Sequence, residues 1–136
     1  MIIKVKKQMV SKVIMLKGGL VLLLKRASSS VDEQSPWTWD LPGGHVDAGE
    51  QPMEAAVREV REETSLNLTS AVRLGEDSNG GKVTHFYTSD SWRGQINLSD
   101  EHEDYMWVSQ DSLLKYEEKM GTMYYKMAIK ALNTRK

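Results

Sequence analysis

The sequence of 136 residues contains no cysteine. This absence excludes disulfides, thiolate metal sites and cysteine nucleophiles, so a metal here must bind through oxygen or imidazole ligands. A chain without disulfides suits a reducing compartment, and we expect a cytoplasmic protein.

Neither sign of charge dominates, because 18 Lys and Arg residues stand against 19 Asp and Glu residues. The resulting net charge of -1 offers no broad attraction to a phosphate backbone or an anionic membrane. We therefore expect neither duplex nucleic acid nor a membrane as a partner. Long apolar runs are also missing: the most apolar stretch, residues 13–24, is interrupted by Lys17-Gly18-Gly19, which excludes a transmembrane helix there.

The composition, 40% hydrophobic and 27% charged, is ordinary for a globular chain that buries a core. The length fits one domain, and we expect it to span residues 1–136. A Gly-Gly pair between two apolar runs predicts a hairpin of strands 10–16 and 20–25. The polar, serine-rich run 28–36 predicts an exposed, mobile loop.

Further along the chain, we expect short extended pieces at 37–41 and at Val46, on either side of Pro42-Gly43-Gly44. A helix is expected from Pro52 to about Thr64, since proline is favoured at the first helical position. Strands are expected at 68–74, 82–89 and 105–108, with a turn over 75–81. Ser109 is a plausible N-cap for a helical region that Gly121 interrupts and that ends near Leu132. This order predicts an α+β (α/β) fold with a mixed sheet between helices.

Three glutamates on the expected helix share one face, because Glu59, Glu62 and Glu63 are spaced i, i+3 and i+4. An adjoining apolar stripe of Met53, Ala56, Val57 and Val60 would pack on the sheet. Carboxylates this close repel one another unless a cation neutralises them, and a hard divalent ion such as Mg²⁺ suits oxygen ligands. Arg58 lies i+4 from Glu54 and i−4 from Glu62, so it could brace the cluster by ion pairs.

The segment from Gly44 to Leu66 closely resembles the Nudix box, G-x5-E-x7-R-E-U-x-E-E-x-G-U, in which U is a bulky aliphatic residue. The matching residues are Gly44, Glu50, Arg58-Glu59, Val60, Glu62-Glu63 and Leu66. Ser65 departs from the pattern, since it stands where the family usually has glycine. If Ser65 ends the helix in the left-handed conformation, serine should cost about 1 kcal/mol there.

The resemblance implies an α/β/α sandwich and divalent-metal-dependent hydrolysis of a nucleoside diphosphate linked to another group. It implies Glu59, Glu62 and Glu63 as ligands of Mg²⁺, or of Mn²⁺, with the Gly43 carbonyl completing the coordination. Glu50 and Arg58 would support the loop and the helix. One of the glutamates would orient or deprotonate the attacking water.

Residues outside the box extend this expected site. The acidic run 99–104 is a candidate for a further metal-binding or base glutamate, with Glu101 the first choice and Glu103 the second. Arg26 could contact phosphate and Gly44 could line the substrate site, while Trp37 or Trp39 could stack on a nucleobase. The alternatives without a role in function are a solvated loop for residues 99–104, a surface cation for Arg26 and core packing for the two tryptophans.

The sequence thus favours a Nudix-type pyrophosphohydrolase that takes a small nucleotide, releasing a nucleoside monophosphate from a nucleoside triphosphate. ADP-ribose, dinucleoside polyphosphates and capped RNA ends stay open as substrates, as does a nucleotide-binding module with poor turnover. The three histidines, His45, His85 and His102, show no metal-ligand spacing and are expected to be hydrogen-bonded or exposed. The oligomeric state cannot be read from the sequence.

Overall fold

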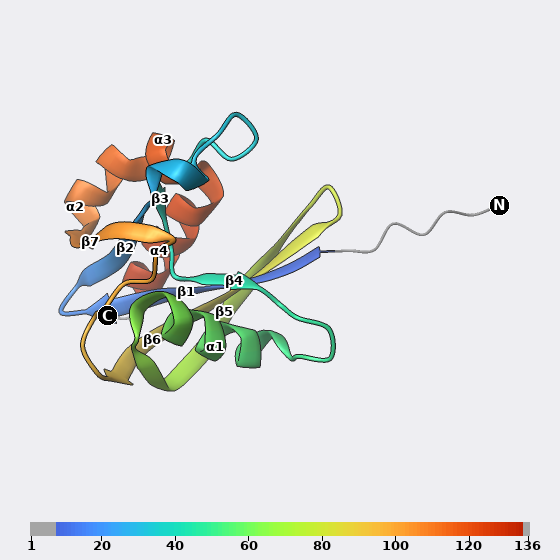
Figure 1. The fold of residues 1–136 in the computed structure, drawn as a ribbon. Coiled ribbons are helices and arrows are strands. Elements are labelled where there is room, and N and C mark those ends of the chain that lie inside the picture. Colours follow the sequence, from blue (N-terminus) through green and yellow to red (C-terminus); the bar gives the residue numbers. More distant parts are fainter. Residues whose placement is uncertain (1–7, 135–136) are drawn as a thin grey trace.

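The computed structural model describes residues 8–134, in which a seven-stranded mixed sheet has helices against both faces (Figure 1). Strands β1 (Gln8–Lys17) and β2 (Leu20–Arg26) form the expected hairpin. Gly18 and Gly19 have φ angles of 56° and 81°, the positive values that a tight two-residue turn requires.

The remaining strands extend the sheet on both sides of this hairpin. Strand β6 (Lys82–Arg93) runs parallel to β1, and β5 (Asn67–Asn79) lies antiparallel to β6 at the edge. Strand β7 (His102–Ser109) is antiparallel to β2, which also pairs with the short β3 (Trp39–Asp40). The short β4 (Gly43–His45) pairs with β1.

Helix α1 (Pro52–Thr64) covers one face of the sheet, as predicted, and α4 (Thr122–Thr134) covers the other (Figure 1). Two single-turn helices, α2 (Gln110–Leu113) and α3 (Glu117–Met120), lie beside α4. The 3-10 turns are η1 (Ser28–Ser30) and η2 (Leu114–Tyr116). Ser109 caps α2 as expected, with its Oγ accepting the N–H of Ser112 at 3.3 Å.

The core is divided by the sheet into two clusters, because successive side chains of a strand point to opposite faces. Val13 and Met15 of β1 pack with the α1 cluster, whereas Ile14 and Leu16 pack with the α4 cluster. Strands covered on both faces need apolar residues at every position, which explains the unbroken apolar runs in the sequence.

Two expectations about the backbone were wrong. The turn expected over 75–81 is only Gly80-Gly81, because β5 and β6 continue as a long ribbon and a bulge near Gly75 absorbs a register shift. The glycines expected between extended pieces belong to a strand themselves, since Gly43 and Gly44 pair with Lys12 and Ser11 of β1.

The apolar stripe of α1 also differs from the expected one. Ala55, Ala56 and Val60 are its buried apolar residues, whereas Val57 is only half-buried and lines a surface groove with Glu54. Helix α4 continues to Thr134, the last residue described, and so passes the expected end near Leu132.

Candidate active site

Helix α1 places two of its glutamates over the glycines of β4. Its start is fixed by Pro52 and by a capping box in which Gln51 and Glu54 satisfy each other's backbone N–H groups. Its end is Ser65, whose φ of 69° is the left-handed conformation that the sequence analysis anticipated. Since Ala56 and Val60 face the sheet, the adjoining carboxylates lie above the Pro42-Gly43-Gly44 segment.

Both positions beneath these carboxylates are glycines in close contact with their surroundings. Glu63 Oε1 accepts the backbone N–H of Gly43 at 2.7 Å, and a Cβ atom on Gly44 would lie 2.6 Å from the Glu59 carboxyl carbon. A Cβ atom on Gly43, whose φ is 134°, would lie 2.1 Å from the Ser11 carbonyl oxygen. The β1 backbone therefore excludes a side chain at Gly43, whereas one at Gly44 would displace the Glu59 carboxylate.

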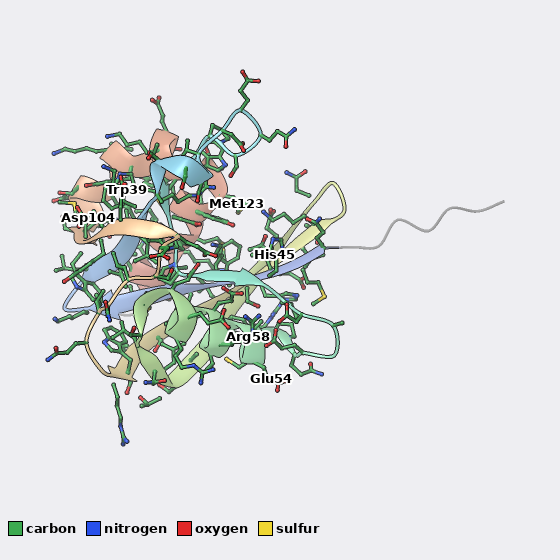
Figure 2. All side chains as sticks on the ribbon, viewed as in Figure 1. Trp39, His45, Glu54, Arg58, Asp104 and Met123 are labelled. Carbon is green, nitrogen blue, oxygen red and sulfur yellow. The ribbon has the colours of Figure 1, made fainter. Side chains whose placement is uncertain are left out.

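Arg58 links the helix to the loop that precedes it (Figure 2). Its Nε donates to Glu50 Oε2 at 2.7 Å, and its Nη2 donates to the carbonyl of His45 at 2.9 Å. Its Nη1 donates to both Glu59 and Glu62, at 2.9 and 3.0 Å. The hydrogen bonds from Arg58 and from the Asp47 N–H hold the pKa of Glu50 down at about 2, so this network stays charged.

The expected ion pair of Arg58 with Glu54 does not form, because the Glu54 carboxylate accepts the backbone N–H of Gln51 instead. Glu62 does pair with Arg58, but it is half-exposed and does not line the cavity beside Glu59 and Glu63. The structure therefore divides the three helix glutamates into an inward pair and an outward Glu62.

A third acidic group reaches the inward pair from the loop before β7. Ligand atoms of Glu63, Glu101 and His102 all lie within 4.8 Å of one another. Glu63 is 5% exposed and His102 is 7% exposed, whereas Glu101 is open to solvent. The backbone carbonyl of Glu101 accepts the N–H of Ala27 at 2.9 Å, which holds this loop against the end of β2.

The chemistry of this cluster fits a divalent cation. Burial raises the pKa of Glu63 to about 8, against the opposing effects of Lys12 and the Gly43 N–H, because an ionised carboxylate is costly inside a protein. The Nδ1 atom of His102 is buried without a hydrogen-bond partner among the described residues. Carboxylate oxygens with an imidazole form a donor set that divalent metals accept.

Lys12, which the sequence analysis did not single out, fixes the backbone of this site. Its buried ammonium donates to the Asp40 carboxylate and to the carbonyls of Leu41 and Gly43, each at 3.1 Å. Burial alone would lower its pKa, but Asp40, Tyr124 and Glu63 together raise it, so the ammonium stays charged. The Gly43 carbonyl, expected as a metal ligand, is here an acceptor for Lys12.

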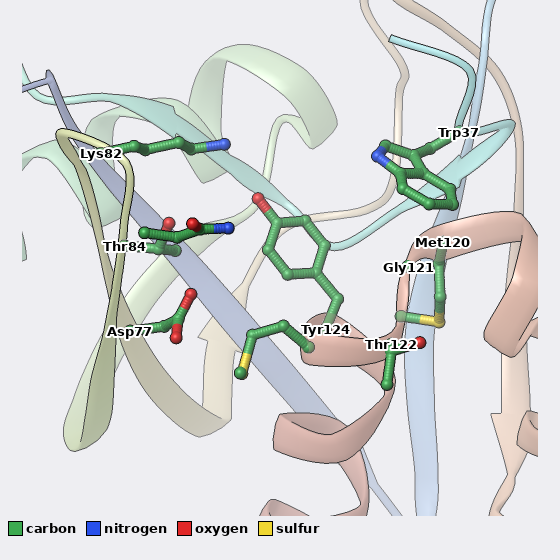
Figure 3. A pocket seen from close by; sticks show the side chains of 10 residues that line it. Trp37, Asp77, Lys82, Thr84, Met120, Gly121, Thr122 and Tyr124 are labelled. Atoms are coloured by element: carbon green, nitrogen blue, oxygen red, sulfur yellow. The ribbon is translucent and has the colours of Figure 1, made fainter.

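Three adjoining chambers form one cleft. The acidic chamber, of about 360 Å³, is lined by Gly43, Gly44, Glu59, Glu63, Glu101 and His102, with Arg26 and His45 at its rim. The middle chamber, of about 230 Å³, contains Lys12, Arg26, Asp40, His45, Lys82 and Tyr124. The distal chamber, of about 260 Å³, contains Trp37, Asp77, Asn79, Lys82, Met120 and Tyr124 (Figure 3).

Arg26 and Trp37 line this cleft, whereas Trp39 does not. The guanidinium of Arg26 donates to the carbonyls of Ser30, Ser35 and Trp37, at 2.6, 3.1 and 2.8 Å, so it pins the loop expected to be mobile. Trp37 is 43% exposed and lines the middle and distal chambers. Trp39 lines none of the three chambers; it packs on the core with its ring centroid 5.3 Å from that of Tyr116.

The sequence held weak signals for the residues that were missed. Lys12 interrupts the apolar run of β1, where a charge needs a buried partner, and His102 directly follows the chosen Glu101. Tyr124 and Asp77 carried no signal, since only the packing of α4 against the β5–β6 ribbon brings them to the cleft.

The sequence is similar to those of known proteins. The chain is 43% identical to an RNA pyrophosphohydrolase of Azorhizobium caulinodans over 60 residues, which are 44% of this chain and 34% of that protein. It is 30% identical to the bis(5'-nucleosyl)-tetraphosphatase [asymmetrical] of Rattus norvegicus, over 74% of each chain. The match thus spans about a third of the first relative and about three quarters of the second.

The fold is also shared with solved structures. The MutT protein of Methanosarcina mazei superposes with a TM-score of 0.80 at 23% identity, covering 98% of this chain and 99% of that one. No helix within residues 8–134 has the length and apolarity needed to span a membrane. The model of the NUDIX domain family matches residues 6–127, and we conclude that the chain belongs to this family.

Proposed function

We propose that this protein is a divalent-metal-dependent pyrophosphohydrolase that cleaves a phosphoanhydride bond of a nucleoside triphosphate. The observation that carries the proposal is the convergence of Glu59, Glu63 and Glu101 on one chamber beside Gly43 and Gly44. Glu59 and Glu63 would hold Mg²⁺ or Mn²⁺. A bound divalent metal would neutralise phosphate charge and lower the pKa of a water molecule.

The protein's own side chains supply the positioning. Arg58 holds Glu59 at the chamber wall, and Lys12 fixes the Gly43 backbone beneath it. Glu101, exposed at the chamber mouth, would accept a proton from the attacking water while the water oxygen bonds to phosphorus. The bond from phosphorus to the bridging oxygen then breaks, and a nucleoside monophosphate and pyrophosphate leave.

The other chambers suit the rest of a nucleotide. Arg26 and His45 give the middle chamber cationic or polar walls that would favour a phosphate chain. Trp37 and Tyr124 give the distal chamber aromatic surface for a base. The single distal chamber favours a substrate with one nucleoside in the cleft.

A dinucleoside polyphosphate is the second candidate substrate. It is favoured by the rat relative, a tetraphosphatase that aligns over 74% of both chains. In this case one nucleoside would occupy the distal chamber and the other would extend from the acidic chamber into solvent. A weakly active nucleotide-binding module is the third candidate. Rapid turnover of a nucleotide would exclude it, and binding with little turnover would support it.

The test is a substrate panel with Mg²⁺, Mn²⁺ or excess chelator, in which the products are separated so that the cleaved bond is known. We expect nucleotide turnover only with metal, and we expect Glu59→Gln to lower kcat by at least about 100-fold, as for loss of a major electrostatic contributor. Glu54→Gln is the matched control, because glutamine can keep the capping box intact. Undiminished turnover in chelator would refute the proposal.

A further inference from the structure

The distal chamber has apolar walls and a polar end (Figure 3). Its walls come from the loop before β3 and from the start of α4, where Trp37 packs 3.6 Å from the position of a Cβ atom on Gly121. Met120 and Tyr124 continue these walls. A flat, aromatic ligand suits a slot of this kind, because base–aromatic stacking depends on a π-face rather than on base identity.

The polar end comes from the tip of the β5–β6 ribbon. Asp77 and Thr84 are register partners there, as are Asn79 and Lys82. The Asp77 carboxylate is half-buried, and no described residue donates a hydrogen bond to it or forms an ion pair with it. Its neighbour Glu76 differs, because it pairs with Arg73 at 3.2 Å and lines none of the three chambers. Asp77 therefore offers two free acceptor oxygens inside the cleft.

The distal chamber is continuous with the proposed catalytic one. It shares Trp37, Lys82, Met120 and Tyr124 with the middle chamber, which in turn shares Arg26, Asp40, Gly44 and His45 with the acidic chamber. A nucleotide whose phosphates reach Glu59 and Glu63 thus extends its base toward Asp77. The inference that follows rests on the proposed function for this placement.

We propose that the distal chamber binds an amino-bearing nucleobase, with guanine preferred, and that Asp77 is the residue that determines this specificity. An ionised carboxylate can only accept hydrogen bonds. Guanine presents two adjacent donors, its ring N1–H and its exocyclic amino group, one for each Asp77 oxygen. Adenine and cytosine offer one amino group, and uracil offers a single N–H between two carbonyl oxygens that the carboxylate repels. Lys82 is a donor for the guanine O6.

The test compares GTP with ITP, which lacks only the exocyclic amino group, and with UTP. For the wild-type protein we expect kcat/KM to favour GTP over ITP and UTP by about tenfold or more, the size of a charge-assisted hydrogen bond. In Asp77→Asn we expect the GTP-to-ITP ratio to fall to within about threefold, chiefly through KM. Glu76→Gln is the matched control and should keep the wild-type ratio. Damage to folding would lower kcat/KM for all three substrates together and leave the GTP-to-ITP ratio unchanged.

Calorimetric titration with GMP, IMP and UMP gives a second readout that needs no turnover. We expect GMP to bind the wild-type protein more tightly than IMP or UMP, and Asp77→Asn to remove this order. If no nucleotide is hydrolysed, the proposed function fails, and the titrations alone decide the base preference. If GTP, ITP and UTP are hydrolysed equally and Asp77→Asn changes nothing, the base preference is overturned while the proposed function stands.

Discussion

Glu101 and Glu103 are separated by one residue, yet the structure gives them different surroundings. Glu101 joins Glu63 and His102 in the acidic chamber, whereas Glu103 Oε1 lies 3.3 Å from Lys25 Nζ on the surface. Residues two apart in a regular strand share a face, but Glu101 lies in the turn before β7. Here the register of β7 against β2 shifts between Lys25 and Arg26, which leaves Glu103 as an extra residue in a bulge. A bulge of this kind redirects a side chain beside a site.

This difference yields a prediction for the loop glutamates. We expect Glu101→Gln to lower kcat by about 100-fold or more, with a smaller change in KM, because a general base acts chiefly in the transition state. Glu103→Gln serves as the control, because Glu103 does not line the acidic chamber and an exposed ion pair of this kind contributes about 1 kcal/mol or less to stability. Steady-state kinetics of both variants make the comparison. Equal losses in the two, or none in either, would remove the catalytic role from this loop.

At the scale of elements, the helix that carries the glutamates was the most predictable part of the chain. The sequence predicts a helix from Pro52 to about Thr64, and the structure confirms both of these ends. The partners of Arg58 were less predictable. Spacing along a helix indicates only i−4 and i+4 neighbours, whereas the strongest partner, Glu50, comes from a loop that folds back over the helix.

The long β5–β6 ribbon shows the same limit. The sequence Gly75 to Gly81 is rich in turn-forming residues, which predicts a loop when only local preferences are weighed. Pairing with β6 overrides that preference, and it carries Asp77 into the cleft. Strand propensity depends on the neighbouring strand, and a neighbour that is distant in the sequence leaves no local pattern.

Ser65 provides the prediction at this scale. Its left-handed backbone costs serine about 1 kcal/mol relative to glycine. Its Oγ, however, donates to the Asn97 carbonyl at 2.9 Å, and a hydrogen bond contributes about 1 kcal/mol. The two effects oppose each other in Ser65→Gly, which we expect to leave the free energy of unfolding within about 0.5 kcal/mol of the wild type.

Ser65→Ala separates these two contributions. Alanine keeps the backbone strain and loses the hydrogen bond, so we expect the free energy of unfolding to fall by about 1 kcal/mol. Urea denaturation of the three proteins gives the values. A Ser65→Gly variant more stable than the wild type by a full 1 kcal/mol would show that the Asn97 contact contributes nothing.

At the scale of the whole molecule, the layered fold follows from the apolar pattern, but the cleft does not. Two-sided burial of β1 and β2 explains the unbroken apolar runs, and these runs predicted strands in a mixed sheet between helices. The cleft instead depends on contacts between distant segments. Glu63 meets Glu101, and Trp37 meets Gly121, only once both faces of the sheet are covered. Residue spacing within one sequence does not predict such long-range contacts.

Trp37 and Trp39 test the division between binding and packing. Trp39 packs edge-on against Tyr116 on the α4 side of the core, so we expect Trp39→Ala to lower the free energy of unfolding by about 3 kcal/mol. Trp37 is 43% exposed, and its backbone stays pinned by Arg26 whatever the side chain. We expect Trp37→Ala to cost less than about 1 kcal/mol of stability, as for a largely solvent-facing residue.

Substrate affinity should show the opposite order. Loss of a stacking surface at Trp37 removes about 1–3 kcal/mol per base, so we expect KM for the best nucleotide to rise by about fivefold or more. Trp39→Ala, assayed below its unfolding transition, should leave KM close to the wild-type value, because its ring lines none of the three chambers. Urea unfolding and steady-state kinetics on the same preparations measure both quantities. If Trp37→Ala kept the wild-type KM, Trp37 would not contact the base, and the base would bind elsewhere than against this wall of the distal chamber.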